Sequence, residues 1–348
     1  MLLHEHLENG ADKNPNFAFS EFEGNSLSYQ EANLLSNQLA NKLVSEGLEV
    51  GDRFAFLAKN CTEMAIMYYA ASKVGAVPVP LNYRLADQEW AYIINDSEAK
   101  LIIVKGNEYS DRINQISSEL KNVKKYISIS LDNSIEKFQD FYDWLSDSSH
   151  EKPTLKIHEN DDVYQMYTSG TTGHPKGAVL LQRNVAANIR QYLNSLTLPR
   201  PSRTLLVAPM YHAAAMINMC GCIAIGGTIV IQEDFIPQDV VDCLANEKIT
   251  HTVLVPAMIQ ACLVSVPNVA SNEYNDLDQI HYGASPIAPE TLKKAMDVFK
   301  CKFGQGFGMT ETVAVICLMT PEEHIRALNE KTELLKSCGR PAIDTQVE

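Results

Sequence analysis

The sequence has no pair of cysteines at CxxC spacing and no cysteine–histidine spacing typical of a structural zinc site. Its eight cysteines are scattered, mostly in apolar segments. Disulfide scaffolds and zinc modules depend on close, regular cysteine spacings, so both classes are disfavoured. We expect free thiols in the protein core and a reducing compartment, the cytoplasm.

Positive charge is also in short supply. The chain has 29 Lys and Arg against 43 Asp and Glu, which gives a net charge of −14. Such a field repels nucleic acid and anionic membrane surfaces, and we expect neither as a partner. Any anion that binds must therefore be held by a local arrangement of donors.

Two further absences concern export and membrane insertion. Residues 1–16 contain acidic side chains where a signal peptide would have its apolar core. The nearly uncharged run at residues 213–231 contains Asn218 and is split by Gly226 and Gly227 before a β-branched stretch. This pattern predicts a buried helix, a turn and a strand, and no transmembrane segment.

Two common phosphate-binding motifs are missing as well. A Walker A loop is excluded because Pro175 precedes Lys176 and Gly177 follows it. The dinucleotide fingerprint GxGxxG fails at its nearest candidate, residues 304–309, where Met309 takes the place of the last glycine. P-loop nucleoside triphosphatases and dinucleotide-dependent dehydrogenases are therefore disfavoured.

What the chain does contain is the segment YTSGTTGHPKG at residues 167–177. Its glycines allow backbone N–H groups to approach an anion, its hydroxyls add neutral donors, and Lys176 adds a positive charge. Hydrogen bonds to a charged group contribute roughly 1.5–3 kcal/mol each, so a few suffice to hold a polyphosphate. A solvated loop is the alternative, but the order TSGTTG followed by PKG favours phosphate binding.

This segment resembles the phosphate loop of the adenylate-forming superfamily, which comprises acyl-CoA synthetases, nonribosomal peptide adenylation domains and luciferases. Further segments resemble the motifs of that superfamily, in the same order. They are two early motifs at residues 28–43 and 73–85, the aromatic–His pair Tyr211-His212, an adenine loop at 283–287, a YGxTE-like motif at 306–311 and a GRP motif at 338–341.

Helix and strand patterns alternate along the chain, which predicts an α/β fold with mostly parallel sheets. We expect helices at residues 28–43, 62–73, 184–195 and 237–247, and strands at 53–58, 77–81, 101–104, 125–131, 204–208, 228–231 and 251–255. Pro78 and Pro80 favour an edge strand. The resemblance implies two packed βαβ-type lobes, at about 50–185 and about 10–49 plus 186–335, with the start of a β-barrel at 336–348.

The resemblance also implies a reaction. A carboxylate attacks the α-phosphorus of ATP, giving an acyl-adenylate and pyrophosphate, and the acyl group then passes to CoA. ATP, Mg²⁺ and CoA are thus the expected cofactors and second substrate. The β- and γ-phosphates would be held by the loop residues Thr168, Ser169, Gly170, Thr171, Thr172, Gly173 and Lys176.

Catalytic roles fall by resemblance on Lys176, Thr310 and Glu311. Thr310 would hydrogen-bond the α-phosphate and Glu311 would be an oxygen ligand of Mg²⁺. The alternative for these two residues is a helix N-terminus, which is compatible with the catalytic role. The nucleotide would further contact Gly283, Ala284, Ser285, Gly306, Phe307, Gly308 and Met309.

One of these expected nucleotide-binding segments has a simpler structural explanation, and another departs from the family pattern. The GASPI segment at 283–287 could be a simple turn before a helix at Pro289. Phe307 stands where the family usually has Tyr, which keeps an aromatic ring for stacking but loses the hydroxyl.

The expected acid-binding residues are Tyr211, His212 and Met216. Peptide-synthetase adenylation domains have an Asp in this region that pairs with the substrate's α-ammonium, whereas residues 210–219 contain no acid. A fatty or other apolar carboxylic acid is therefore expected. Met216, Met219, Met258 and Ile259 could line an adaptable pocket, with core packing as the alternative.

The last residues, 341–348, resemble the opening strand of the barrel. The resemblance places three groups beyond residue 348: an Asp that grips the ribose, a hinge residue and a catalytic Lys. We therefore expect these 348 residues alone to have little or no adenylating activity. A non-catalytic binding module and an enzyme with another acceptor, such as an acyl-carrier-protein ligase, remain alternatives, and a homo-oligomer is possible.

Overall fold

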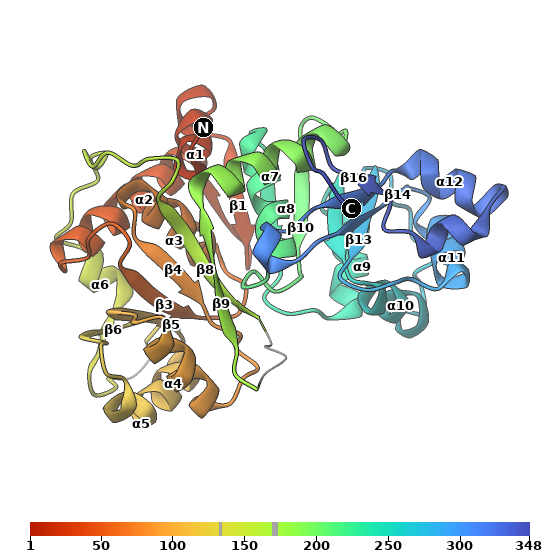
Figure 1. Ribbon diagram of the computed structural model, residues 1–348. Coiled ribbons are helices and arrows are strands. Elements are labelled where there is room, and N and C mark those ends of the chain that lie inside the picture. Colours follow the sequence, from red (N-terminus) through yellow and green to blue (C-terminus); the bar gives the residue numbers. More distant parts are fainter. Residues whose placement is uncertain (132–133, 169–172) are drawn as a thin grey trace. The chain divides into compact units, whose positions relative to one another are not determined.

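The computed structural model describes residues 1–131, 134–168 and 173–348 (Figure 1). Four expected phosphate-loop residues, Ser169, Gly170, Thr171 and Thr172, therefore lie outside the described residues. The chain divides into two compact units, here described separately: unit 1 contains residues 1–15 and 29–186, and unit 2 contains residues 16–28 and 187–348. Both units are built on sheets covered by helices, which confirms the predicted α/β class.

Unit 1 has a five-stranded, fully parallel sheet in the order β4-β3-β5-β6-β7. The strands are β3 (Arg53–Leu57), β4 (Val77–Pro80), β5 (Leu101–Lys105), β6 (Lys125–Ile129) and β7 (Phe138–Asp140). The first four match the predicted strands. β4 lies at the edge, as Pro78 and Pro80 predicted, because proline cannot donate to a second neighbour.

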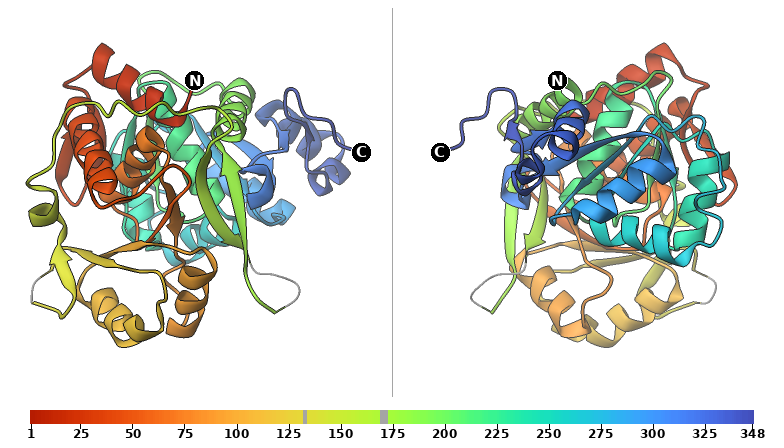
Figure 2. Two further views of the ribbon diagram at one scale, coloured as in Figure 1. Left: turned by 60° about the vertical axis from the view of Figure 1, so that its left-hand side comes forward. Right: turned by 90° about the vertical axis from the view of Figure 1, so that its right-hand side faces the viewer.

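Both faces of this sheet are buried, which explains its nearly continuous apolar strands. Ala55 and Leu57 point to one face, where they pack against α4 (Asp87–Asp96) and α5 (Asn107–Ile116). Figure 2 shows these two helices, coloured orange to yellow, side by side on that face. The alternate residues Phe54 and Phe56 are equally buried on the opposite face.

The remaining helices of unit 1 correct the expected lobe boundary. The helix α2 (Tyr29–Ser45), assigned above to the second lobe, belongs to unit 1 together with α1 (Leu3–Lys13). The reason is packing against α3 (Thr62–Val74), whose buried Lys73 donates hydrogen bonds of 2.6 Å to Asn33 and to Asn37 of α2. Unit 1 also contains the 3₁₀ turn η1 (Ser117–Glu119), α6 (Phe141–Leu145) and the antiparallel hairpin of β8 (Asp162–Thr168) and β9 (Lys176–Leu181).

Unit 2 has a nine-stranded sheet in the order β16-β15-β14-β13-β12-β10-β11-β1-β2. Its six central strands, from β14 to β1, are parallel, and antiparallel strands lie at both edges. The bounds are β1 (Ala18–Phe22), β2 (Asn25–Ser28), β10 (Arg203–Leu206), β11 (Thr228–Ile231), β12 (His251–Leu254), β13 (Gln279–Gly283), β14 (Lys302–Phe307), β15 (Cys317–Met319) and β16 (Arg340–Pro341). The segment expected to open a barrel thus supplies β16, the edge strand beside β15.

Helices cover the sheet of unit 2. One face packs against α9 (Pro237–Asn246), α10 (Pro256–Ser265) and α11 (Pro289–Phe299). α7 (Gln182–Ser195) continues from unit 1 into unit 2, where α8 (Ala213–Ala224) contacts β10, β11 and β12. The unit also contains η2 (Thr310–Thr312), α12 (Pro321–Asn329) and η3 (Thr332–Lys336).

The nearly uncharged run at 213–231 forms α8, a turn and β11, as predicted. Within the described parts of the chain, we find no helix with the length and apolar character needed to cross a membrane. All eight cysteines are free thiols, six of them buried, which confirms that part of the prediction.

Candidate functional site

The expected phosphate loop lies at the tip of the β8–β9 hairpin. Thr168 ends β8 and is paired with Lys176, which begins β9 with an exposed side chain. Gly173 has φ +101°, a backbone conformation that favours glycine. The hairpin therefore presents Thr168 and Lys176 on either side of the same turn.

Two aromatic side chains connect this hairpin to α4. The hydroxyl of Tyr167 donates a hydrogen bond of 2.6 Å to Asp96, and the ring of Tyr92 stacks on His174 with centroids 4.8 Å apart. Burial and the neighbouring Asp96 carboxylate raise the pKa of Tyr167, so its hydroxyl remains protonated and can donate. No pattern in the sequence indicates this support, since only the fold brings α4 to the hairpin.

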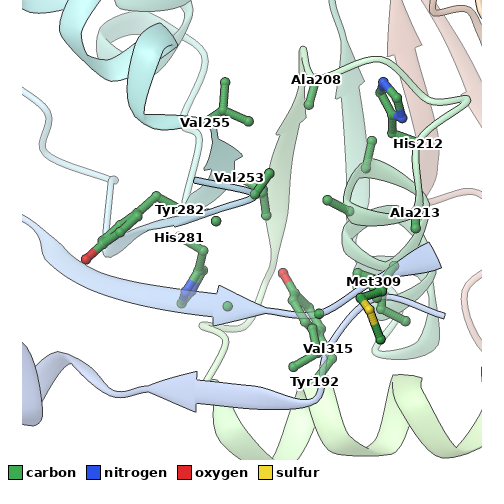
Figure 3. A pocket seen from close by; sticks show the side chains of 18 of the residues that line it. Tyr192, Ala208, His212, Ala213, Val253, Val255, His281, Tyr282, Met309 and Val315 are labelled. Carbon is green, nitrogen blue, oxygen red and sulfur yellow. The ribbon is translucent and has the colours of Figure 1, made fainter. Parts of the chain in front are cut away.

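Unit 2 contains two cavities near the carboxyl ends of its parallel strands, where ligands of open α/β sheets usually bind. The first has a volume of about 410 Å³, and the second about 640 Å³. Figure 3 shows the first cavity, with side chains from β12, β13 and α8 and from the segments after β10 and β14. The second is lined by the loop after β13, by the end of β14 and by residues 332–338.

The two cavities share a wall. Ala284, Gly306 and Gly308 line both of them. Residues expected to bind nucleotide divide between the two: Gly283, Met309 and Thr310 line the first, and Ser285 and Phe307 line the second. The structure thus brings the GASPI and GFGMTE segments together, although they are more than fifteen residues apart in the sequence.

Close backbone packing explains the small residues in this wall. A Cβ on Gly283 would collide with the carbonyl oxygen of Gly306 in the neighbouring strand, and a Cβ on Gly308 would overlap the carbonyl oxygen of Ala314. Ala284 has φ +64°, in the left-handed region, which is strained for a residue with a Cβ. Packing therefore requires small residues in this wall, and the binding role of the GASPI segment stays a prediction.

Thr310 and Glu311 begin the short turn η2. Glu311 is exposed, and within the described residues no cluster of three or more His, Cys, Asp or Glu side chains is arranged to hold a metal. Mg²⁺ in nucleotide sites is usually held by one or two carboxylates together with substrate phosphates, so a single carboxylate fits that donor set. The hydroxyl that bonds the backbone of this turn belongs to Thr312, at 3.1 Å from the Met309 nitrogen.

Only one of the three expected acid-binding residues lines the first cavity. His212 lies at its wall, with its ring 4.3 Å from that of Tyr211. Tyr211 and Met216 are buried outside the lining, and Met216 accepts a hydrogen bond from Cys220. Met219 and Ile259 are fully buried as well, and Met258 packs on the core, as the alternative of core packing expects.

Helical geometry explains this correction. Residues 213, 214, 215 and 217 of α8 line the cavity, while Met216, Met219 and Cys220 point away from it on the rest of the helix surface. The cavity is also lined by three residues that were not predicted, Tyr192 of α7, Val253 of β12 and His281 of β13. Apolar and partly polar residues are ordinary at helix and strand positions, so nothing in the sequence marked these three as lining residues.

The first cavity is apolar and uncharged. Its described lining contains no Asp, Glu, Lys or Arg. Burial lowers the pKa of His281 to about 3, so its ring is neutral near pH 7. An ionised group therefore finds no counterion within this cavity.

The model of the AMP-binding enzyme family matches residues 7–348, nearly the whole chain. The chain is 29% identical over 323 residues to long-chain-fatty-acid–CoA ligase FadD13 of Mycobacterium tuberculosis, covering 92% of this chain and 61% of that protein. It is 30% identical over 327 residues to fatty acid–[acyl-carrier-protein] ligase ScoC of Streptomyces coeruleorubidus, covering 92% of this chain and 59% of that protein. The chain thus spans about three-fifths of the length of these relatives.

Solved structures agree with these matches. The inhibitor-bound N-terminal domain of FACL13 from Mycobacterium tuberculosis superimposes with a TM-score of 0.87 at 26% identity, covering 98% of this chain and 82% of that one. An anthranilate–CoA ligase in complex with anthranoyl-AMP, AuaEII, shares the fold with a TM-score of 0.89 at 19% identity, covering 99% of this chain and 64% of that one. The resemblance on which the sequence analysis relied is confirmed, and this chain belongs to the family of AMP-binding enzymes.

Proposed function

We propose that this chain is the N-terminal part of an ATP-dependent acyl-CoA ligase that activates an apolar carboxylic acid as its acyl-adenylate. The observation that carries the proposal is the wall shared by the two cavities of unit 2, formed by Ala284, Gly306 and Gly308. Formation of an acyl-adenylate requires an acid and a nucleotide to meet. Two adjoining cavities, one apolar and one lined by the expected adenine loop, suit that requirement.

In this proposal the second cavity takes the adenine. Phe307 is 44% exposed and lines that cavity, so its ring is available to stack on a base. The small residues Ala284 and Ser285 leave the backbone open to a flat ligand. Thr168 and Lys176 of the hairpin would bind the β- and γ-phosphates, together with the loop residues between them.

The first cavity takes the acid. Its uncharged lining favours an apolar chain or ring, and it has no acidic side chain to pair with an α-ammonium group. The carboxylate would lie at the part of the cavity that His212 lines, and the apolar part of the acid would contact the remaining neutral lining, which includes His281. The relatives named fatty-acid, feruloyl and 2-succinylbenzoate ligases support a carboxylic acid substrate.

Mg²⁺ supplies charge neutralisation for the phosphates when it is bound. Glu311 fits as one oxygen ligand, because its exposed carboxylate is adjacent to Thr310 at the first cavity. Thr310 would hydrogen-bond the α-phosphate. Lys176 would follow the negative charge of the departing pyrophosphate.

The acyl acceptor is proposed to be CoA, as in the CoA ligases among the relatives. A carrier protein is the second candidate, because the acyl-carrier-protein ligase ScoC is 30% identical to this chain. That the 348 residues alone have little adenylating activity stays a prediction.

Calorimetry with the 348-residue protein tests the proposal directly. We expect MgATP to bind and an apolar acid to bind. An α-amino acid of similar size should not bind. A protein that binds neither MgATP nor any apolar acid would contradict the proposal. Acid-dependent pyrophosphate exchange into ATP, followed by acyl transfer to CoA or to a carrier protein, then distinguishes the two acceptors in a protein that joins this chain to the downstream segments found in its relatives.

A further inference from the structure

Tyr192 of α7 lies at the wall of the first cavity. Figure 3 shows its ring rising from α7, with Val315 and His281 nearby. The residue is 3% exposed, and burial raises the pKa of its phenol, so the hydroxyl stays protonated. That hydroxyl donates a hydrogen bond of 2.9 Å to Oδ1 of Asn218 in α8.

Asn218 is held in turn by the sheet. Its Nδ2 donates a hydrogen bond of 3.0 Å to Oγ1 of Thr204 in β10. All three side chains are buried, and a buried hydroxyl that lost its partner would leave polar groups unpaired at a substantial cost. The orientation of the Tyr192 ring is therefore set by a chain of hydrogen bonds from α7 through α8 to β10.

The ring also has no room to move toward α8. A Cβ on Gly221 would lie 2.6 Å from Cδ1 and 2.7 Å from Cε1 of Tyr192, so the ring packs directly on the helix at that glycine. The ring of His281 is edge-on to it, with centroids 6.5 Å apart. Tyr192 thus occupies a slot that only a glycine in α8 leaves open.

The slot lies at a defined depth. Along α8, Asn218 is six residues and Gly221 nine residues beyond His212, which at 1.5 Å per residue is about 9 and about 14 Å. His212 marks the end of the cavity where the carboxylate is proposed to lie. An acid that enters at His212 therefore meets the Tyr192 ring after about two helical turns.

We infer that Tyr192 closes the far end of the first cavity and limits the length of the acid that it accepts. This inference rests on the proposed function and deepens it, because it names the class of acid. The fitting substrates have an apolar part that ends within this depth, such as an aryl ring or an alkyl group of short to medium length. A long unbranched chain exceeds the depth available in front of the ring.

Titration of straight-chain acids of increasing length into the 348-residue protein, by calorimetry in the presence of MgATP, tests the inference. Affinity should rise about fourfold per methylene up to a limiting length and fall beyond it, since each buried methylene contributes a similar transfer free energy. In Tyr192→Leu the limiting length should increase by at least two methylenes. Acids beyond the original limit should gain at least tenfold in affinity relative to the shortest acid.

Two further variants serve as controls. Tyr192→Phe loses the hydroxyl but keeps the ring, which still packs on Gly221, so its limiting length should equal that of the unmodified protein. Gly221→Ala should push the ring into the cavity and shorten the limit, which tests the same slot without truncating Tyr192. Circular dichroism and MgATP affinity report whether each variant is folded.

The outcomes separate the two proposals. If acids bind but the limiting length is the same in Tyr192→Leu, Gly221→Ala and the unmodified protein, the inference about Tyr192 is overturned. If no apolar acid binds to the unmodified protein, the acid site of the proposed function is wrong instead.

Discussion

The hydroxyl of Tyr282 lies 2.8 Å from Nε2 of the buried His324. The other ring nitrogen of His324, Nδ1, lies 2.8 Å from the carbonyl oxygen of Thr320, which can only accept a hydrogen bond. Nδ1 therefore carries the proton, and Nε2 accepts from Tyr282. Since Tyr282 directly precedes Gly283, this pair connects the GASPI segment to α12.

Removal of this hydroxyl should destabilise the protein. We expect Tyr282→Phe to lower the free energy of unfolding by about 1–3 kcal/mol, because Nε2 of His324 is left buried without its donor. Urea denaturation measures the change. A double-mutant cycle with His324→Leu should show that the two effects are not additive; additive losses would mean that the pair does not interact.

The stability of the protein should fall as the pH is lowered from 7 to 5. Burial lowers the pKa of His251 and that of His281 to about 3, well below 6.5, so the unfolded chain binds protons that the folded chain does not. The folded state therefore has its full stability above the pKa of the unfolded chain and loses stability as the pH falls below that value. Each histidine should cost about 2 kcal/mol between pH 7 and pH 5.

Urea denaturation at several pH values checks this expectation. His251→Gln should have a smaller loss of stability between pH 7 and pH 5 than the unmodified protein, even if its stability at pH 7 is lower. An unchanged pH dependence in this variant would show that His251 is not kept neutral by burial.

Lys176 should contribute to the affinity for the polyphosphate and not to the affinity for the nucleoside. We expect Lys176→Ala to weaken MgATP binding about 10- to 150-fold, the equivalent of one lost charge-assisted hydrogen bond of roughly 1.5–3 kcal/mol. AMP, which lacks the β- and γ-phosphates, should bind equally to both proteins. Lys121→Ala, at another exposed lysine, is the matched control, and an equal loss of AMP and ATP affinity would contradict the assignment.

The support from α4 predicts a milder effect at the same hairpin. Tyr167→Phe removes the hydrogen bond to Asp96 and should reduce MgATP affinity several-fold by loosening the hairpin that carries Lys176. Adenosine affinity should not change. If calorimetry shows the same MgATP affinity in this variant, α4 does not position the phosphate-binding residues.

Alanine substitutions at Gly306 and Gly308, both in the wall shared by the two cavities, can be compared directly. Gly308→Ala should destabilise the protein by about 1–3 kcal/mol or more, because its Cβ would overlap the Ala314 carbonyl oxygen. At Gly306 a Cβ meets only Cγ2 of Val315, at 3.9 Å, so Gly306→Ala should fold normally. Thermal unfolding of both variants compares them, and equal melting temperatures would be inconsistent with this packing.

Much of the fold could be predicted from the sequence because the signals are local. The apolar strand Arg53–Leu57 and the helix Thr62–Val74 are written in consecutive residues, and Pro78 and Pro80 marked an edge strand. The hairpin β1–β2 and the helices α4 and α5 were not predicted. Their sequences are mixed in polarity, and they are stabilised mainly by contacts with distant residues.

The lining of the first cavity shows the same division at the level of single residues. His212 was predicted from a pair of neighbours in the sequence and does line the cavity, whereas Met216 is turned away from it on α8. The choice between them depends on which face of the helix meets the sheet. That is a property of packing and not of composition.

The sequence by itself determined the family, through ordered motifs whose glycines, hydroxyls and lysine are needed at fixed spacing. Only the tertiary structure decided that Gly306 and Gly308 line two adjoining cavities and that Tyr192 lines one of them. The physical reason is distance along the chain. Tyr192 is positioned by Asn218 and Gly221, more than twenty-five residues away, and such contacts arise only when the helices pack on the sheet.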